Sequence, residues 1–109
     1  MEYFSSKPKL AVLLLEFAYL LYFGLHNPVL KSDLYCGITN ELERRRKEHN
    51  VMQYIQTVKM DSFELAQEVE AIMHDAGFDT GKQLGNGQEN TVYVYLYRKI
   101  PGVTIENPN

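Results

Sequence analysis

The sequence is short of cysteine, with Cys36 as the single example among 109 residues. One cysteine excludes an intramolecular disulfide and removes any zinc site built from several cysteines. A protein without disulfides suits a reducing compartment, so we expect a cytoplasmic protein. The length is that of one domain with a hydrophobic core that needs no covalent support. We therefore expect residues 1–109 to form a single domain.

Several common functional motifs are also missing. The segment GFDTGKQ at 77–83 lacks the spacing of a phosphate-binding P-loop, and Gln83 stands where that motif has the Ser or Thr that binds Mg²⁺. The three histidines show no close metal-ligand spacing, and there is neither an internal repeat nor a low-complexity segment. Nucleotide-binding loops and histidine-based metal sites are therefore not predicted.

Positive charge is scarce overall, since the formal net charge is −3. Proteins that coat nucleic acid are usually basic, so this balance argues against that class. The basic residues are nevertheless concentrated, with Arg44, Arg45, Arg46 and Lys47 in succession, while acids gather in residues 61–75. Because phosphate contacts are local, one basic helix could still serve a nucleic-acid site.

The apolar run at residues 10–25 has two interpretations. It is shorter than the roughly 20 apolar residues that span a bilayer, and Glu16 lies in its middle. Lys7 and Lys9 before it resemble the start of a signal peptide, but no small-residue cleavage site follows. We interpret its later part, residues 17–23, as a buried strand and expect no membrane partner. A membrane-anchored or secreted interaction protein that uses residues 10–25 is the alternative.

The order of predicted elements indicates an α+β fold with a small, mainly antiparallel sheet flanked by helices. After an irregular start with Pro8, a hairpin of two strands leads into a helix with an Asn40–Glu43 capping box and an Asn50 cap. A second helix has an Asp61–Glu64 capping box and ends at Gly77, and a Gly-rich connector or substrate loop occupies 81–90. The predicted strands are 17–23, 34–38, 51–60 and 91–99, with a turn over 26–33.

One face of the first predicted helix combines an aliphatic residue with cations. At 100° per residue, Leu42, Arg45, Arg46 and His49 fall on one side. Because Leu42 is the only aliphatic residue, its side should face the protein and direct Arg45 and His49 toward the sheet. A guanidinium there needs an anion, and phosphate fits it well. A solvated helix with i,i+4 ion pairs is the alternative.

The second predicted helix places one carboxylate beside its apolar stripe. That stripe comprises Leu65, Ala66, Val69, Ile72, Met73 and Ala76. Glu70 lies at its margin, where a carboxylate is either paired or holds a hard cation such as Mg²⁺. A salt bridge at the rim is the other interpretation.

Tyrosine is abundant, at eight residues. Strict alternation over 91–99 puts Tyr93, Tyr95 and Tyr97 on one face of a strand and Val92, Val94 and Leu96 on the other. Tyr35 directly precedes Cys36-Gly37, where glycine leaves room for a second backbone. Packing is the ordinary role of such tyrosines, and a catalytic one needs a neighbouring cation.

Residues 34–50, LYCGITNELERRRKEHN, resemble the GIY-YIG endonuclease family. In that family a Tyr-x-Gly strand leads into a helix that carries Arg and, four residues later, His. The segment Ala66-x-x-x-Glu70 is similar to the family's metal-binding helix, so the resemblance covers residues 17–76. It implies a metal-dependent DNA endonuclease that uses one Mg²⁺ or Mn²⁺.

Residue roles follow from the resemblance alone. It implies that Tyr35 is the general base or orients the attacking water, and that Arg45 stabilises charge on the phosphoryl oxygens. It also implies that Tyr22 assists Tyr35, that His49 assists proton transfer or positions the site, and that Glu70 holds the metal.

The first tyrosine of the family motif has no Gly-Ile-Tyr match here. Tyr22 is the best-spaced candidate and Tyr19 its rival. A catalytically degenerate module that binds nucleic acid or protein is therefore an alternative function.

Overall fold

The computed structural model describes residues 2–25, 30–81 and 90–107. The predicted turn residues 26–28 and most of the Gly-rich stretch, 82–89, lie outside this description. The chain alternates strands and helices in the order β1 (Glu2–Ser5), α1 (Pro8–Leu25), a 3-10 turn (Lys31–Asp33), β2 (Leu34–Thr39), α2 (Leu42–Glu48), β3 (Gln56–Met60), α3 (Phe63–Asp75) and β4 (Tyr93–Arg98).

The four strands form one sheet in the order β1-β3-β4-β2. β4 pairs antiparallel with both β2 and β3, whereas β1 runs parallel to β3. The predicted α+β class with a mainly antiparallel sheet is confirmed. The last strand in the sequence is thus an inner strand of the sheet, with β2 on one side and β3 on the other.

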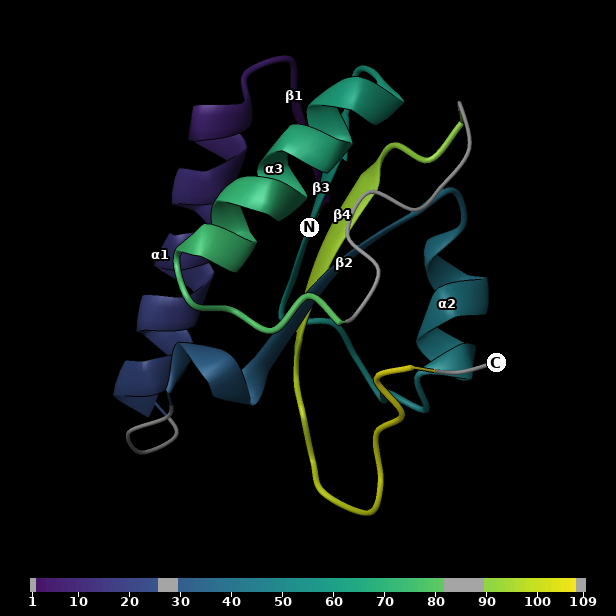
Figure 1. Cartoon of the computed structure of the whole chain (residues 1–109). Helices are drawn as coiled ribbons and strands as arrows, with labels where there is room; N and C mark the ends of the chain where they lie inside the picture. The colour runs from purple at the N-terminus through teal and green to yellow at the C-terminus, as the bar shows by residue number, and fades with distance from the viewer. Residues whose placement is uncertain (1, 26–29, 82–89, 108–109) are drawn as a thin grey trace.

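The helices cover the two faces of the sheet unequally (Figure 1). α1 and α3 lie side by side on one face, and α2 lies on the other. The predicted alternation of β4 is confirmed, because Val94 and Leu96 join the core under α1 and α3. Tyr95 and Tyr97 pack on the opposite face with Tyr35 and Val51. This second, aromatic face is where most of the chemistry-bearing residues collect.

The prediction of a strand at 17–23 is wrong, since these residues belong to α1. Pro8 occupies the first helical position, where its missing N–H costs nothing, and Val12 is the single β-branched residue in the helix. The expected irregular start is also wrong, because Glu2–Ser5 form β1. Among the described helices, none is long and apolar enough to cross a membrane.

The helix starts differ from the predicted capping boxes. α2 begins at Leu42, and the side chain of its N-cap residue, Glu41, makes no capping bond. At α3 the N-cap is Ser62, whose hydroxyl accepts a hydrogen bond from the Leu65 N–H at 3.2 Å. Both helix ends are as predicted, with Asn50 at φ 55° and Gly77 at φ 106°. The third predicted strand is shorter than expected, since β3 starts only at Gln56.

Candidate functional site

Four tyrosines and one histidine form a buried group between the sheet and α2, which we call the tyrosine–histidine cluster. Ring centroids are 5.1 Å apart for Tyr35 and His49, and 4.9 Å apart for Tyr54 and Tyr95. Tyr35 and Tyr97 stack at 5.2 Å. The members of the cluster are Tyr35, His49, Tyr54, Tyr95 and Tyr97. They come from β2, the end of α2, the loop before β3, and β4.

His49 is fully buried at the centre of this cluster. Its Nδ1 contacts the carbonyl oxygen of Ile105, and its Nε2 lies 2.7 Å from the hydroxyl of Tyr95. A carbonyl only accepts hydrogen bonds, so the proton of the neutral ring belongs on Nδ1. Nε2 is then an acceptor, and Tyr95 donates its hydroxyl hydrogen to it. The backbone at Ile105 thereby fixes the histidine tautomer.

The C-terminal segment, residues 103–107, lies against this cluster. The Ile105 N–H donates to the His49 carbonyl at 2.7 Å, and the Asn50 side chain donates to the Val103 carbonyl at 2.9 Å. The hydroxyl of Tyr97 donates to Glu106 at 2.9 Å. The sequence predicts no role for this segment, because its composition does not indicate a contact with a helix more than 50 residues earlier.

Burial lowers the pKa of His49 below its usual range. The positive charge of Arg45 lowers this pKa further. The Ile105 carbonyl and the charges of Glu106 and Glu48 act in the opposite direction and raise it. The ring is therefore neutral near pH 7. A neutral imidazole whose Nε2 already accepts a hydrogen bond from Tyr95 is suited to accept the proton of that hydroxyl.

Arg45 lies at the edge of the cluster, with 28% of its side chain exposed. Its guanidinium is 2.8 Å from the Glu48 carboxylate and also donates a hydrogen bond to the Tyr95 hydroxyl. The predicted inward direction of Arg45 and His49 is confirmed. On the outer side the alternative of i,i+4 ion pairs also holds, as shown by Arg44 with Glu48. Arg46, which the helical angles put on the inner side, pairs with Glu43.

Tyr35 is buried beside three charged groups. Burial raises its pKa to about 12, with the Arg45 charge opposing and the charges of Glu70 and Asp79 adding to the rise. The phenol is therefore protonated at neutral pH and acts as a hydrogen-bond donor. Its hydroxyl lies next to Gly81, where an added Cβ would be 2.8 Å away. Gly81 has φ 78°, so glycine meets both the space and the backbone requirement there.

Gly37 explains how Tyr95 reaches the cluster. A Cβ on Gly37 would overlap the Tyr95 hydroxyl and lie 2.5 Å from its Cζ. The two residues are directly paired across β2 and β4. Glycine in the Tyr35-Cys36-Gly37 strand segment thus leaves space for a side chain, whereas we had expected it to admit a second backbone.

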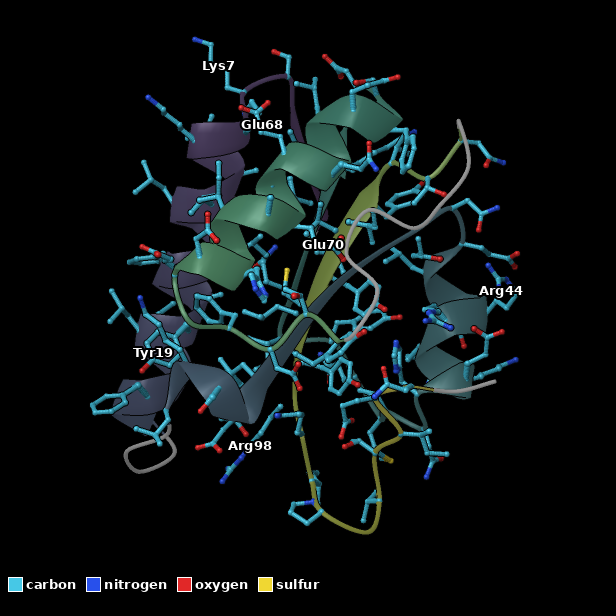
Figure 2. All side chains as sticks on the ribbon, in the orientation of Figure 1. Lys7, Tyr19, Arg44, Glu68, Glu70 and Arg98 are labelled. Carbon is cyan, nitrogen blue, oxygen red and sulfur yellow. The ribbon has the colours of Figure 1, made fainter. Side chains whose placement is uncertain are left out.

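Glu70 lies on α3 with only 5% of its surface exposed. Its negative charge raises the pKa of Tyr35 and of the buried Cys36 thiol, so it is close to β2. In Figure 2, Glu70 is directed toward the sheet, whereas Glu68 on the same helix points outward. Glu70 thus approaches Tyr35 from the α3 side of the strand that carries both Tyr35 and Cys36.

Oxygen donors decide whether a magnesium ion would fit here. Glu70 supplies one buried carboxylate, and Mg²⁺ usually keeps several waters and takes further oxygens from a phosphate. Within residues 2–25, 30–81 and 90–107 no group of three or more acidic, His or Cys side chains is arranged to hold a metal. A site with a single protein carboxylate is the arrangement that these residues fit.

Tyr22 is not brought into the cluster. It lies on α1, on the opposite face of the sheet, where the Arg98 guanidinium is 3.4 Å from its hydroxyl. Its rival Tyr19 lies on the same helix and packs edge-on against Phe78 at 5.5 Å. Both residues are helical, so neither lies on the strand that was predicted at 17–23. The strand that does pair with β2 is β4, where Tyr95 and Tyr97 belong to the cluster.

Comparison of the chain with protein-family models, with curated proteins and with solved structures finds no match.

Proposed function

We propose that this chain is a metal-dependent DNA endonuclease of the GIY-YIG type, in which Tyr95 takes the role of the first tyrosine. The observation that supports this most is the cluster itself. Tyr35, Arg45 and His49 come from the segment that resembles the family and lie close to one another, and the charge of one buried acid, Glu70, reaches Tyr35 from the α3 side of β2.

The strand order supports Tyr95 in that role. The family motif requires a tyrosine strand that pairs antiparallel with the Tyr-x-Gly strand, and here β4 pairs in this way with β2. Arg98 at the end of β4 is opposite Leu34 at the start of β2, and the Lys99 N–H donates to the Asp33 carbonyl at 2.9 Å. The chain would thus carry the first tyrosine strand after the rest of the motif, a circular permutation of the family order.

The chemistry follows from the groups in contact. The Arg45 side chain is 28% exposed, so the scissile phosphate would approach it and exchange for Glu48 as its anion. Tyr95 would pass its proton to Nε2 of His49 while its oxygen takes a proton from the attacking water. Tyr35, protonated at neutral pH, would orient that water. Bound Mg²⁺ or Mn²⁺, held by Glu70, would supply Lewis-acid stabilisation of the leaving oxygen.

Cleavage of branched, nicked and linear DNA with Mg²⁺ or Mn²⁺ tests the proposal. We expect cleavage by the wild type and its loss in Glu70→Gln and Arg45→Ala. The matched controls are Glu68→Gln, an exposed acid on α3, and Arg44→Ala, the exposed neighbour on α2. Cleavage that survives Glu70→Gln would refute the metal-ligand role of Glu70.

A second candidate is a catalytically degenerate module that binds nucleic acid without cutting it. It is favoured by the ion pair of Arg45 with Glu48, which already satisfies part of the guanidinium. This candidate predicts that the wild type binds branched DNA, with affinity that falls with salt, but cleaves none of the three substrates. Loss of binding in Arg45→Ala but not in Glu70→Gln would distinguish binding from catalysis.

A further inference from the structure

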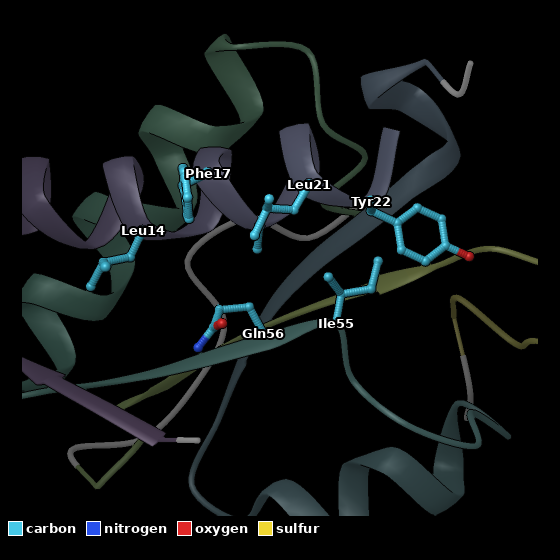
Figure 3. A pocket seen from close by; sticks show the side chains of 7 residues that line it. Leu14, Phe17, Leu21, Tyr22, Ile55 and Gln56 are labelled. Carbon is cyan, nitrogen blue, oxygen red and sulfur yellow. The ribbon is translucent and has the colours of Figure 1, made fainter. Parts of the chain in front are cut away.

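The outer face of α1 carries a row of large apolar side chains that stay exposed among the residues that the structure describes. Six of them are between 40% and 62% exposed, whereas Ala11 and Leu15 on the inner face of the helix are fully buried. The exposed residues are Leu10, Leu13, Phe17, Leu20, Leu21 and Phe23. The row continues into a groove that Leu14, Leu21 and Tyr22 of α1 form with Ile55 and Gln56 (Figure 3).

The spacing of this row matches that of a helix–helix seam. Leu10, Leu13, Phe17, Leu20 and Gly24 follow one another at intervals of three, four, three and four residues. Alternating steps of three and four keep the side chains on one stripe that faces a second helix. An added Cβ on Gly24 would meet nothing within 4 Å, so the end of the stripe offers room for a side chain from outside.

The exposed area is of the size that an interface needs. At ordinary free areas for Leu and Phe side chains, the six exposed fractions amount to about 600 Å². A standard protein–protein interface hides about 800 Å² on each partner, including a polar rim. The apolar row alone supplies about three quarters of that value.

A lipid surface fits α1 less well. A helix that lies in a membrane interface has a strongly basic polar face opposite its apolar face. In α1 the opposite face is the protein core, and the net charge of −3 would be repelled by anionic lipid. A second protein helix suits both the spacing and the charge.

We propose that two copies of this chain pair through α1, with the helices antiparallel and Phe17 at the two-fold axis. The two-fold makes the stripe complementary to itself. It sets Leu13 opposite Leu21 of the second copy and Leu10 opposite Gly24. A parallel pair would instead bring Lys9 and the positive helix ends of both copies together. The dimer would leave α2 and the tyrosine–histidine cluster of each copy uncovered, since they lie on the other face of the sheet.

Sedimentation equilibrium of the purified chain at micromolar concentrations tests the dimer. We expect the wild type to be dimeric and Phe17→Glu to be monomeric with an unchanged circular dichroism spectrum. Met52→Glu is the control, because Met52 is 93% exposed and lies beside α2, where Arg46 donates a hydrogen bond to its carbonyl, and it should remain dimeric. A monomeric wild type, or a dimer that survives Phe17→Glu, would overturn the proposal.

Disulfide trapping tests the direction of the helices. Cys36 is fully buried, so a thiol introduced on α1 is the reactive one. Under copper-phenanthroline, Phe17→Cys should give a covalent dimer, because residues at the two-fold come within disulfide distance. Leu13→Cys should not, since the antiparallel arrangement separates the two positions by about 12 Å along the helices. Cross-linking of both variants would indicate a parallel pair and overturn the antiparallel assignment.

Vesicle sedimentation separates a second copy from a lipid surface. With phosphatidylcholine vesicles, the dimer proposal predicts that the wild type stays in the supernatant. A wild type that is monomeric in solution and pellets with vesicles, while Phe17→Glu does not, would replace the second copy with a membrane surface and overturn the proposal.

Discussion

The hydroxyl of Tyr95 lies 2.7 Å from Nε2 of His49, although the two residues are 46 positions apart in the sequence. β4 brings Tyr95 to this point by inserting between β2 and β3. α2 brings His49 by directing the side of Leu42 inward. The contact therefore depends on the strand order of the sheet as well as on the local motif of residues 34–50.

Replacing Tyr95 or Tyr22 by Phe tests which of the two serves as the first tyrosine of the family motif. In Tyr95→Phe the buried Nε2 of His49 loses its partner, so we expect a stability loss of about 1–3 kcal/mol and a fall in DNA cleavage of about 10²-fold or more. Tyr22→Phe should change neither much, because Tyr22 lies on the opposite face and contacts Arg98. Urea denaturation and nicking assays on both variants measure the two effects. Loss of cleavage in Tyr22→Phe with retention in Tyr95→Phe would reverse the assignment.

The local patterns of the sequence predicted much of the site. The angular positions of Arg45 and His49 and the margin position of Glu70 follow from helical periodicity, which the structure reproduces because both helices bury one stripe. The alternation of tyrosine and aliphatic residues in β4 was equally readable. In each case the information lies within about ten residues, where the direction of a side chain is decided by its own helix or strand.

What could not be predicted depends on contacts distant in sequence. The pairing of β2 with β4 and the contact of Ile105 with His49 join segments more than 50 residues apart. The error at α1 has a different cause. The apolar residues of α1 are spread around the helix, so the hydrophobic pattern has no clear helical period. The Leu-rich composition favours a helix, but the expected hairpin with residues 34–38 led to the prediction of a strand.

Gly37→Ala should disturb the cluster without removing any polar group. The added methyl group would overlap Tyr95, whose ring is held in place by His49 and fully surrounded. Overpacking of this kind costs about 1–3 kcal/mol. We expect a lower midpoint of denaturation and, by near-ultraviolet circular dichroism, a changed tyrosine environment. An unchanged midpoint and spectrum would show that the ring has space to move.

The C-terminal segment should matter for the site through its backbone. Ile105→Pro removes the N–H that donates to the His49 carbonyl and disturbs the carbonyl that accepts from Nδ1. We expect a loss of cleavage of about 10-fold or more, because the histidine tautomer is no longer fixed. Ile105→Ala keeps the backbone, and its side chain is half exposed, so this control should be close to wild type. Equal losses in both variants would mean that the side chain, and not the backbone, is what matters.

Stability should fall as the pH drops through the range in which histidine titrates. The folded state lowers the pKa of His49 below the ordinary 6.5, so at mildly acidic pH the unfolded chain binds a proton that the folded chain does not. The free energy of unfolding therefore decreases as the pH falls below about 6.5, until the pH passes the folded pKa. Chemical denaturation at pH values from 8 to about 5 measures this slope, before carboxylate titration dominates.

A histidine outside the cluster provides the control for that slope. His49→Gln should have a lower stability at pH 8 but a flatter dependence on pH, because the group whose pKa differs between the two states is gone. His74, which is exposed on α3 and contacts the Thr80 hydroxyl at 2.9 Å, should leave the slope unchanged when it is replaced by Gln. If His74→Gln flattened the curve and His49→Gln did not, the acid sensitivity would belong to α3 and not to the tyrosine–histidine cluster.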